Sequence, residues 1–193
     1  MSVTTRDLVN SGVFSAVYFV LLFSTGMLGV INPAMMFVGF ALGIIANGVT
    51  LALYRARVRK VGAMAVLGVV VGLLMMLSGH PWYLFTISGL LGLVSDLIAA
   101  GRKFRDPRTN ALAYAVLSLW YVGPWLPMIL NREAYRAYIA DSMGQAYADS
   151  LAWFFSPTML AAWGVCVFVL GLVGGAFGNS VLQRHFAKAG LAG

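Results

Sequence analysis

The sequence predicts an all-α integral membrane protein, a six-transmembrane-helix bundle with both termini on the cytoplasmic side. First, hydrophobic residues make up 61% of the 193 positions and charged residues only 10%, whereas about a quarter of a soluble domain is charged. Second, the apolar runs are continuous, and an uninterrupted run of roughly 20 apolar residues crosses a bilayer as a helix. Third, basic residues are concentrated in alternate connections, which is typical of cytoplasmic loops.

Each predicted span is an apolar run bounded by helix breakers or basic residues. The six runs and their connections form a single transmembrane domain over residues 1–193. They cover residues 8–30, 34–54, 61–77, 82–100, 110–130 and 157–182.

Local signals set the end of each run in order along the chain. Pro33 separates the first run from the second, because proline lacks an amide hydrogen and restricts the residue before it. The basic segment 55–60 ends the second run, and Ser-Gly-His-Pro at 78–81 ends the third. Basic residues within 102–108 end the fourth, and Gly-Pro-Trp-Leu-Pro at 123–127 interrupts the fifth. The sixth run is continuous.

The distribution of basic residues supports an even number of spans. With six, the N-terminus, the second-to-third loop, the fourth-to-fifth loop and the C-terminal tail share one side, which then holds 11 of the 13 basic residues. Only Arg132 and Arg136 lie on the other side. Cations in short loops resist translocation, so the basic side is cytoplasmic. We interpret the basic loops as topology anchors, and the net charge of +7 does not indicate a nucleic-acid partner.

The long outer connection, residues 131–156, has the pattern of an amphipathic helix. It is predicted either to close over a cavity as a lid or to lie in the interface and seal the bundle. The residues of its apolar face recur every three or four positions: Tyr135, Tyr138, Ile139, Met143, Tyr147 and Leu151.

Few residues in the predicted spans can carry out chemistry. No G-x-x-x-x-G-K-[ST] phosphate loop is present, and no nucleophile has an evident base nearby. His80 and His185 lie on opposite sides in this topology, so neither a metal site nor a cofactor is predicted, and no catalytic residue is assigned. The predicted spans contain one carboxylate, Asp96, and no basic residue. Asp96 either pairs with Arg102 or Lys103 near the cytoplasmic surface or has a functional role.

Aromatic and polar side chains converge on the outer half of the bundle and predict a small-molecule site. Trp82 and Trp125 also fit the role of interfacial anchors. Arg132 and Arg136 can meet a carboxylate or phosphate, or be satisfied with Glu133 on a solvated face. A vitamin-like heterocycle and a porphyrin-like molecule both fit this composition. The candidate substrate-binding residues are Asn32, His80, Trp82, Trp120, Trp125, Arg132, Tyr135, Gln145 and Tyr147.

Short segments in a particular order and spacing, covering nearly the whole chain, carry a family resemblance. They are Asp7-Leu8, 12–20, 68–82, 96–98, 114–120, Arg132-x-Ala134-Tyr135, 144–149 and 185–190. With them the chain resembles the substrate-binding S components of energy-coupling-factor (ECF) transporters, in the group called Trep-Strep or Mpt-family S components.

The resemblance implies a multi-pass protein of the prokaryotic cell membrane that binds a micronutrient from outside. It implies association with a T component and two cytoplasmic ATPases, so that ATP hydrolysis occurs on partner chains and not on this one. S components contact the T component through a small-x-x-x-small motif on the first helix, usually Ala-x-x-x-Ala, and here these positions are Gly12 and Ala16.

Three other functions are weighed against this one. A stand-alone secondary transporter or facilitator would use Asp96 as its coupling group. A structural membrane subunit would bind no ligand and would tolerate loss of Trp120 or Arg132. An integral-membrane enzyme ranks last, because the sequence lacks catalytic groups.

Overall fold

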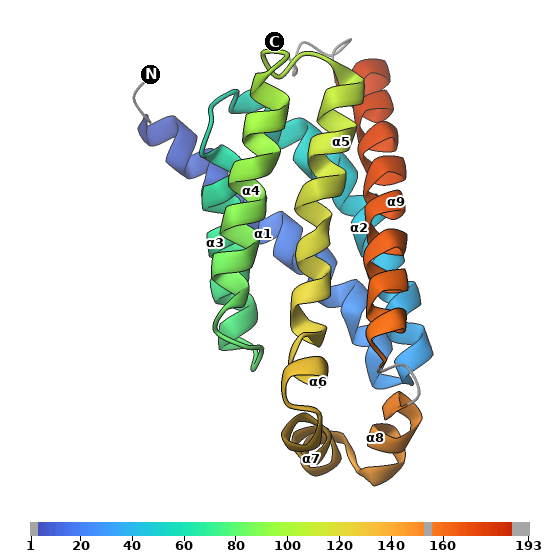
Figure 1. The fold of residues 1–193 in the computed structure, drawn as a ribbon. Helices are drawn as coiled ribbons and strands as arrows, with labels where there is room; N and C mark the ends of the chain where they lie inside the picture. The colour runs from blue at the N-terminus through green and yellow to red at the C-terminus, as the bar shows by residue number, and fades with distance from the viewer. Residues whose placement is uncertain (1–3, 153–155, 187–193) are drawn as a thin grey trace.

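The computed structural model describes residues 4–152 and 156–186, and within these residues every regular element is a helix. The bundle elements, shown in Figure 1, are α1 (Thr5–Gly26), η1 (Met27–Val30), α2 (Pro33–Arg57), α3 (Ala63–Leu77), α4 (Leu84–Ala100), α5 (Pro107–Ser118), η2 (Leu119–Trp125), α6 (Pro127–Leu130), α9 (Pro157–Val181) and η3 (Leu182–Phe186). Between α6 and α9 lie α7 (Arg132–Met143) and α8 (Gln145–Ala152). The all-α prediction is therefore confirmed.

Side-chain caps explain where four of these helices begin. Thr4 forms a capping box with Asp7 at the start of α1. Asn32, Asp106 and Ser156 each accept a hydrogen bond from a backbone amide in the first turn of α2, α5 and α9. Proline follows each of these three residues and occupies the first helical position, where the missing amide hydrogen costs nothing.

Within the described residues, three helices have the length and composition of membrane spans: Thr5–Val30, Pro33–Arg57 and Pro157–Arg184. α3 and α4 are apolar but shorter, with 15 and 17 residues, and a helix of 15 residues is only about 22 Å long. The count of six crossings therefore stays a prediction.

The fifth predicted run, residues 110–130, is a helix that changes character before its end. α5 stops at Ser118 and continues as the 3-10 helix η2 and the single turn α6. Pro124 lies inside η2, and Pro127 begins α6. Neither proline can donate a helical hydrogen bond, which is why the continuous α-helix is lost here.

The helices of the inner half pack through glycine. On α9, Gly174 and Gly178 face α2, and a Cβ atom built at Gly178 would lie 2.1 Å from the carbonyl oxygen of Gly48. Gly171 and Gly175 face α5, where a Cβ would lie 2.6 and 2.8 Å from the Cα atoms of alanines. Small residues allow the backbones to touch, which drives helix association in lipid. α2 and α5 therefore both pack closely against α9.

α3 and α4 form a second close pair. A Cβ at Gly68 would lie 2.3 Å from the carbonyl oxygen of Ser88, and one at Gly92 would lie 2.4 Å from that of Met64. The Ser88 hydroxyl donates to the Gly68 carbonyl at 2.7 Å. α1 crosses this bundle obliquely in Figure 1 and contacts α2 and α3.

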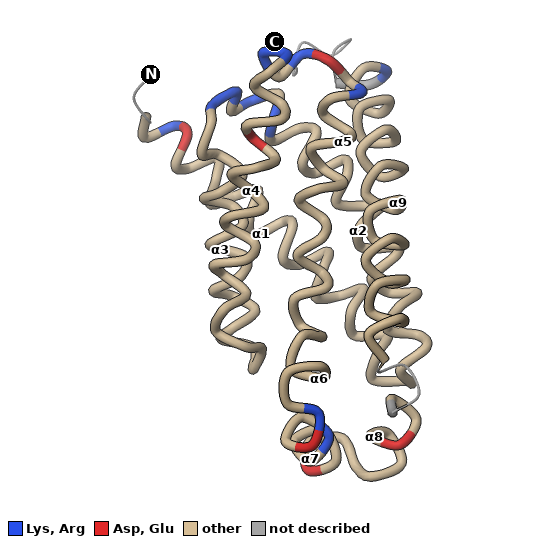
Figure 2. The backbone as a smooth tube through the Cα atoms, viewed as in Figure 1, with Lys and Arg blue, Asp and Glu red and all other residues tan. Residues whose placement is uncertain are grey.

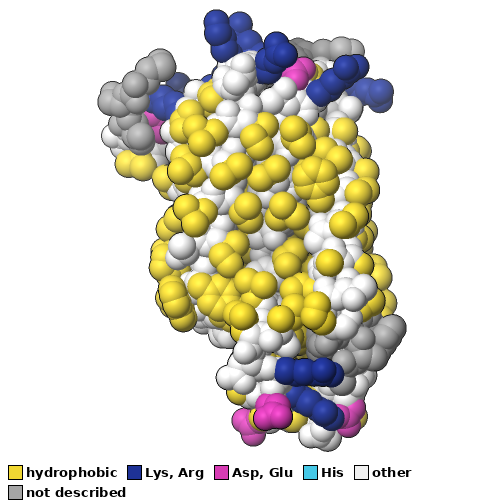
Figure 3. Space-filling view, in the orientation of Figure 1, with side chains coloured by type: hydrophobic (Ala, Val, Ile, Leu, Met, Phe, Trp, Pro, Cys, Tyr) yellow, Lys and Arg dark blue, Asp and Glu magenta, His cyan; other side chains and the backbone are white. Residues whose placement is uncertain are grey.

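The charged residues lie at the two ends of the molecule. In Figure 2 the basic residues gather at the end where α1 begins and α9 finishes, and a smaller group of charged residues lies on α7 and α8 at the opposite end. On the face seen in Figure 3, an apolar belt fills the space between them. This arrangement is that of an integral membrane protein, with the described parts of both termini at one end.

The outer connection is two helices and not the single amphipathic helix that the sequence suggested. α7 ends at Met143, and Gly144 has φ of 91°, a left-handed conformation that glycine adopts without strain. α8 begins directly afterwards, at Gln145. The end of the predicted segment 131–156 falls partly on residues 153–155, which lie outside the described residues.

Candidate functional site

A cavity of about 460 Å³ lies at the end of the bundle that carries α7 and α8, which the sequence predicts to be the outer end. Its walls come from the α3–α4 connection, the proline-rich η2–α6 segment, the start of α2, and the two helices α7 and α8, which we call the lid. All six residues of the predicted apolar face of 131–156 line it: Tyr135, Tyr138, Ile139, Met143, Tyr147 and Leu151. The predicted apolar face of the lid therefore lines the cavity, although Tyr138 and Met143 are also partly exposed at the surface.

One hydrogen bond and one close approach join the lid to neighbouring connections. The Tyr147 hydroxyl donates to the carbonyl oxygen of Gly29 in η1 at 2.8 Å. Gly79, in the α3–α4 connection, faces the lid closely enough that a Cβ there would lie 3.8 Å from the Tyr138 hydroxyl. The lid thus touches the ends of two helical hairpins.

Four of the nine predicted ligand residues line this cavity: His80, Trp125, Tyr135 and Tyr147. Burial lowers the pKa of His80, so that its imidazole is neutral at pH 7 and can donate from one nitrogen and accept at the other. Burial raises the pKa of Tyr135 to about 12, so that its hydroxyl stays protonated. The site offers uncharged hydrogen-bonding groups among aromatic rings.

Trp125 lines both this cavity and a neighbouring apolar cleft. Its ring stacks on Phe37 of α2, with centroids 5.4 Å apart and an interplanar angle of 14°. The neighbouring cleft, of about 270 Å³, is lined by Phe37, Trp125 and Trp163 among other apolar residues. A flat ligand above Trp125 would therefore meet a ring that is already held in place.

The other five predicted ligand residues do not line the cavity. Asn32 caps α2 by accepting from the amide of Met35 at 2.9 Å. Trp82 is 67% exposed and contacts Tyr83 edge to face, as an interfacial anchor would. Arg132 is exposed at the start of α7, and Gln145 is exposed while its amide donates to Asp149 at 3.0 Å.

Trp120, the fifth of these residues, lies deep in the bundle. It is 2% exposed, and its indole Nε1–H donates to the Tyr18 hydroxyl at 2.9 Å. Tyr18 in turn accepts at its carbonyl oxygen from Asn47 Nδ2 at 3.3 Å. Trp120 therefore links η2 to α1 and α2 in the core.

Arg136 also differs from its expected arrangement. Its guanidinium forms an ion pair with Asp149 of α8, and not with Glu133 or with the cavity. The hydrogen bonds from Arg136 and Gln145 lower the pKa of Asp149. The pair bridges α7 and α8 across Gly144, so it stabilises the angle of the lid.

Several cavity residues were not among the nine. The cavity is also lined by Met36 and Phe40 of α2, by Ser142, by residues 78, 79 and 81 of the α3–α4 connection, and by Pro124 and Pro127. Phe40 and Met36 lie inside a uniformly apolar run, where no sequence signal separates a wall residue from a packing residue. The sequence did carry a signal for four lid residues, because their spacing of three or four positions predicts one apolar face: Tyr138, Ile139, Met143 and Leu151.

At the basic end, Asp96 is the N-terminal cap of α3. It is 1% exposed, and one carboxylate oxygen accepts from the amides of Gly62 and Met64 at 2.8 and 2.9 Å. A carboxylate at a helix N-terminus satisfies amides that have no partner within the helix. Asp96 therefore does not pair with Arg102 or Lys103, and its position assigns it a structural role.

The same region contains a basic residue inside the bundle, contrary to the sequence prediction. α2 extends to Arg57, beyond the predicted end at Tyr54, and Arg55 is 5% exposed. Its guanidinium donates to Ser95 Oγ at 2.8 Å and to the carbonyl oxygen of Asn110 at 3.2 Å. Arg55 thus joins α2 to α4 and α5.

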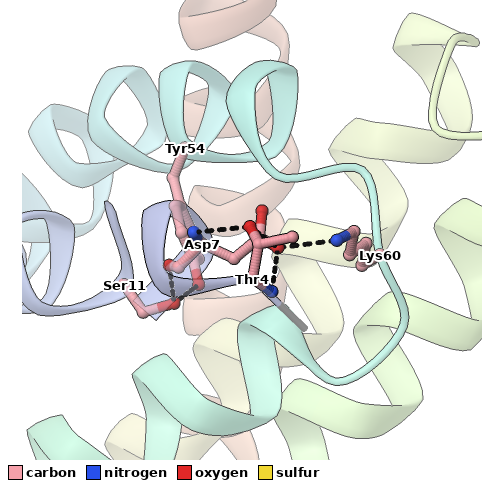
Figure 4. Close-up of polar contacts among 5 residues, drawn as sticks. All are labelled: Thr4, Asp7, Ser11, Tyr54 and Lys60. Carbon is pink, nitrogen blue, oxygen red and sulfur yellow. Dashed lines mark hydrogen bonds and ion pairs between the residues drawn. The ribbon is translucent and has the colours of Figure 1, made fainter. Parts of the chain in front are cut away.

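Figure 4 shows how α1 is attached at this end. Lys60, in the α2–α3 connection, forms an ion pair with Asp7 at 2.6 Å. The hydroxyls of Ser11 and Tyr54 lie 2.6 Å apart, and Tyr54 donates to the carbonyl oxygen of Ala63 at 2.9 Å. These contacts fix the start of α1 to the α2–α3 connection. Among the described residues no three His, Cys, Asp or Glu side chains are placed to hold a metal.

Asp96→Ala is expected to lower the free energy of unfolding by about 1–3 kcal/mol, since two buried amides lose their acceptor. Asp96→Asn keeps an oxygen at this position and is expected to cost less. Thermal unfolding in mild detergent measures both variants. Uptake by the reconstituted chain alone that Asp96→Asn abolishes, without loss of stability, would contradict the structural role and favour a secondary transporter.

A comparison with protein-family models gives one match over nearly the whole chain. The model described as a hypothetical bacterial integral membrane protein (Trep_Strep) matches residues 5–188. No curated protein and no solved structure matches the chain.

Proposed function

Since the chain belongs to the Trep_Strep family of bacterial integral membrane proteins, we propose that it is the S component of an ECF-type ABC importer. It captures a vitamin-like micronutrient and delivers it inward with a T component and two ATPases. In this proposal the chain crosses the bacterial cell membrane six times. Both termini are cytoplasmic, because the described cations other than Arg132 and Arg136 lie at the end of the molecule where α1 begins.

The observation that carries this proposal is the lidded cavity at the end remote from the basic residues. Its volume of about 460 Å³ lies within the range of small-molecule sites. Aromatic rings from η2 and the lid provide faces for a flat heterocycle, and His80 provides a directional hydrogen bond. No Lys or Arg lines the cavity, which favours an uncharged ring system over a phosphorylated one.

The exposed face of α1 supports the partner assignment. Gly12 and Ala16 are both exposed, and a Cβ built at Gly12 would meet no atom within 4 Å. Exposed valines flank them, Val13 and Val17 among these. A helix of another chain can therefore approach the backbone of α1 closely at these two positions.

The test is native mass spectrometry of the protein purified in mild detergent, without ATP or partners. A bound small molecule is expected. Tyr135→Leu keeps an apolar side chain but removes the ring, and we expect bound ligand to fall by about tenfold, because an aromatic pair is worth about 0.5–1.5 kcal/mol.

Trp82→Leu is the matched control, because this exposed aromatic residue also lies at the outer end but does not line the cavity. It is expected to keep the ligand. Equal loss in the two variants would exclude this cavity as the site. A protein that never binds a small molecule, even from a bacterial extract, would overturn the S-component proposal.

A further inference from the structure

A second cleft, of about 240 Å³, lies at the basic end of the bundle. It is bounded by the last turns of α2 and α9 and by the α4–α5 connection. Its polar wall includes Arg59, Arg105 and Gln183, and its apolar wall includes Ala52 and Leu182. It is therefore separate from the outer cavity and has the opposite electrostatic character.

Among the described residues, the two guanidinium groups of this cleft have no counter-charge. The cleft lining contains no carboxylate, and neither Arg59 nor Arg105 forms an ion pair among the described residues. Each carboxylate at this end has other partners: Asp7 pairs with Lys60, Asp96 caps α3, and Asp106 caps α5.

Asp106 needs separate attention because it adjoins Arg105 in sequence. Its carboxylate accepts from the amide of Thr109 at 2.8 Å and from the Thr109 hydroxyl. These hydrogen bonds lower its pKa, so it stays ionised and bound to the start of α5. Its charge is directed into the helix and leaves the cleft positive.

The cleft has fixed walls. Asn179 of α9 donates through Nδ2 to the carbonyl oxygen of Pro107 at 2.8 Å, and Asn110 of α5 donates to that of Phe104 at 3.1 Å. Lys103 and Phe104 have φ of 54° and 59°, which turn the α4–α5 connection sharply. The cleft is therefore built by side chains bonded to the loop and not by a loose surface.

We propose that this cleft binds the headgroup of an anionic phospholipid, with Arg59 and Arg105 on the phosphate and the acyl chains along Ala52 and Leu182. The proposal rests on two guanidinium groups that lie next to apolar helix surfaces at the edge of the apolar belt. Guanidinium forks match phosphate oxygens, and basic pockets between helices at a membrane surface suit lipid headgroups. The inference is independent of the transport proposal.

The test compares two double variants that each remove two positive charges from the same end. Arg59→Gln with Arg105→Gln changes the cleft, whereas Arg6→Gln with Arg57→Gln changes exposed residues outside it. Each protein is placed in nanodiscs of phosphatidylcholine alone or with one quarter, roughly, of phosphatidylglycerol. Retained lipid is counted by native mass spectrometry after release into detergent.

We expect the parent protein and the Arg6/Arg57 variant to retain phosphatidylglycerol over phosphatidylcholine. The Arg59/Arg105 variant should retain roughly thirtyfold less phosphatidylglycerol at low salt, because it alone loses the charged hydrogen bonds between guanidinium and phosphate. Equal losses in both variants would show a diffuse charge effect, and no loss in either would show that the cleft holds no lipid. If added inorganic phosphate displaces the retained lipid completely, the cleft is a site for free phosphate. Each of these three results overturns the proposal.

Discussion

Gly178→Ala is expected to lower the free energy of unfolding by about 3 kcal/mol, at the upper end of the range for overpacked sites. The added Cβ would lie 2.1 Å from the backbone oxygen of Gly48, and backbone atoms cannot move aside as a flexible side chain can. α2 and α9 would have to separate along their length. Gly48→Ala is expected to behave alike, since its Cβ would lie 2.0 Å from the Gly174 oxygen.

The matched control is Gly164→Ala on the same helix. Its Cβ would lie 3.7 Å from Val122 Cγ2, which is ordinary contact, and alanine favours a helix over glycine by about 1 kcal/mol. This variant is expected to be unchanged or slightly more stable. The unfolding temperatures of the two variants in detergent, monitored by tryptophan fluorescence, test this difference. If Gly178→Ala unfolds at the temperature of Gly164→Ala, the close α2–α9 contact is wrong.

Gly12→Leu and Ala16→Leu are each expected to abolish uptake by the assembled transporter while leaving ligand binding unchanged. Both positions are exposed on α1, so a larger side chain disturbs no internal packing. It would hold a partner helix away from the α1 backbone, where close approach replaces a hydrophobic driving force. Uptake of labelled substrate into cells and ligand binding by the purified chain give the two readouts.

Ala176→Leu provides the comparison for these two variants. It makes the same substitution as Ala16→Leu at an exposed position of α9, a helix with no proposed partner contact, and it is expected to leave uptake unchanged. Loss of ligand binding in Gly12→Leu or Ala16→Leu would rule out the interface assignment. Normal uptake in both would argue against an S component that works through α1.

The helix ends were predictable because local chemistry sets them. Asn32-Pro33 and Ser156-Pro157 carry a cap and a proline side by side, and α2 and α9 begin there. The interruption of the fifth run at Pro124 was likewise visible in the sequence. The break at Gly144 was not, because one glycine within an amphipathic pattern is compatible with a continuous helix.

The candidate site was predicted in part, and the difference has a physical cause. Tyr135 and Tyr147 line the cavity because helical periodicity places each of them on the apolar face of its own helix, α7 or α8. Asn32 and Gln145 do not line the cavity, because each side chain forms a local hydrogen bond. The polarity of a residue alone does not show whether it bonds to a neighbouring residue or to a ligand. The capping role of Asp96 depends on α3 and α4 lying side by side, which no local pattern encodes.

α2 and α9 are in close contact at one end and farther apart at the other. At the basic end their backbones touch through glycines, whereas at the outer end they are held apart by rings, with Phe37 and Trp163 edge to face at 4.8 Å. Rings can slide and rotate over one another, but touching backbones cannot. We expect the α2–α9 pair to be rigid at the basic end and more easily deformed at the opposite end. A ligand entering beneath the lid would then strain only the part of the bundle able to yield.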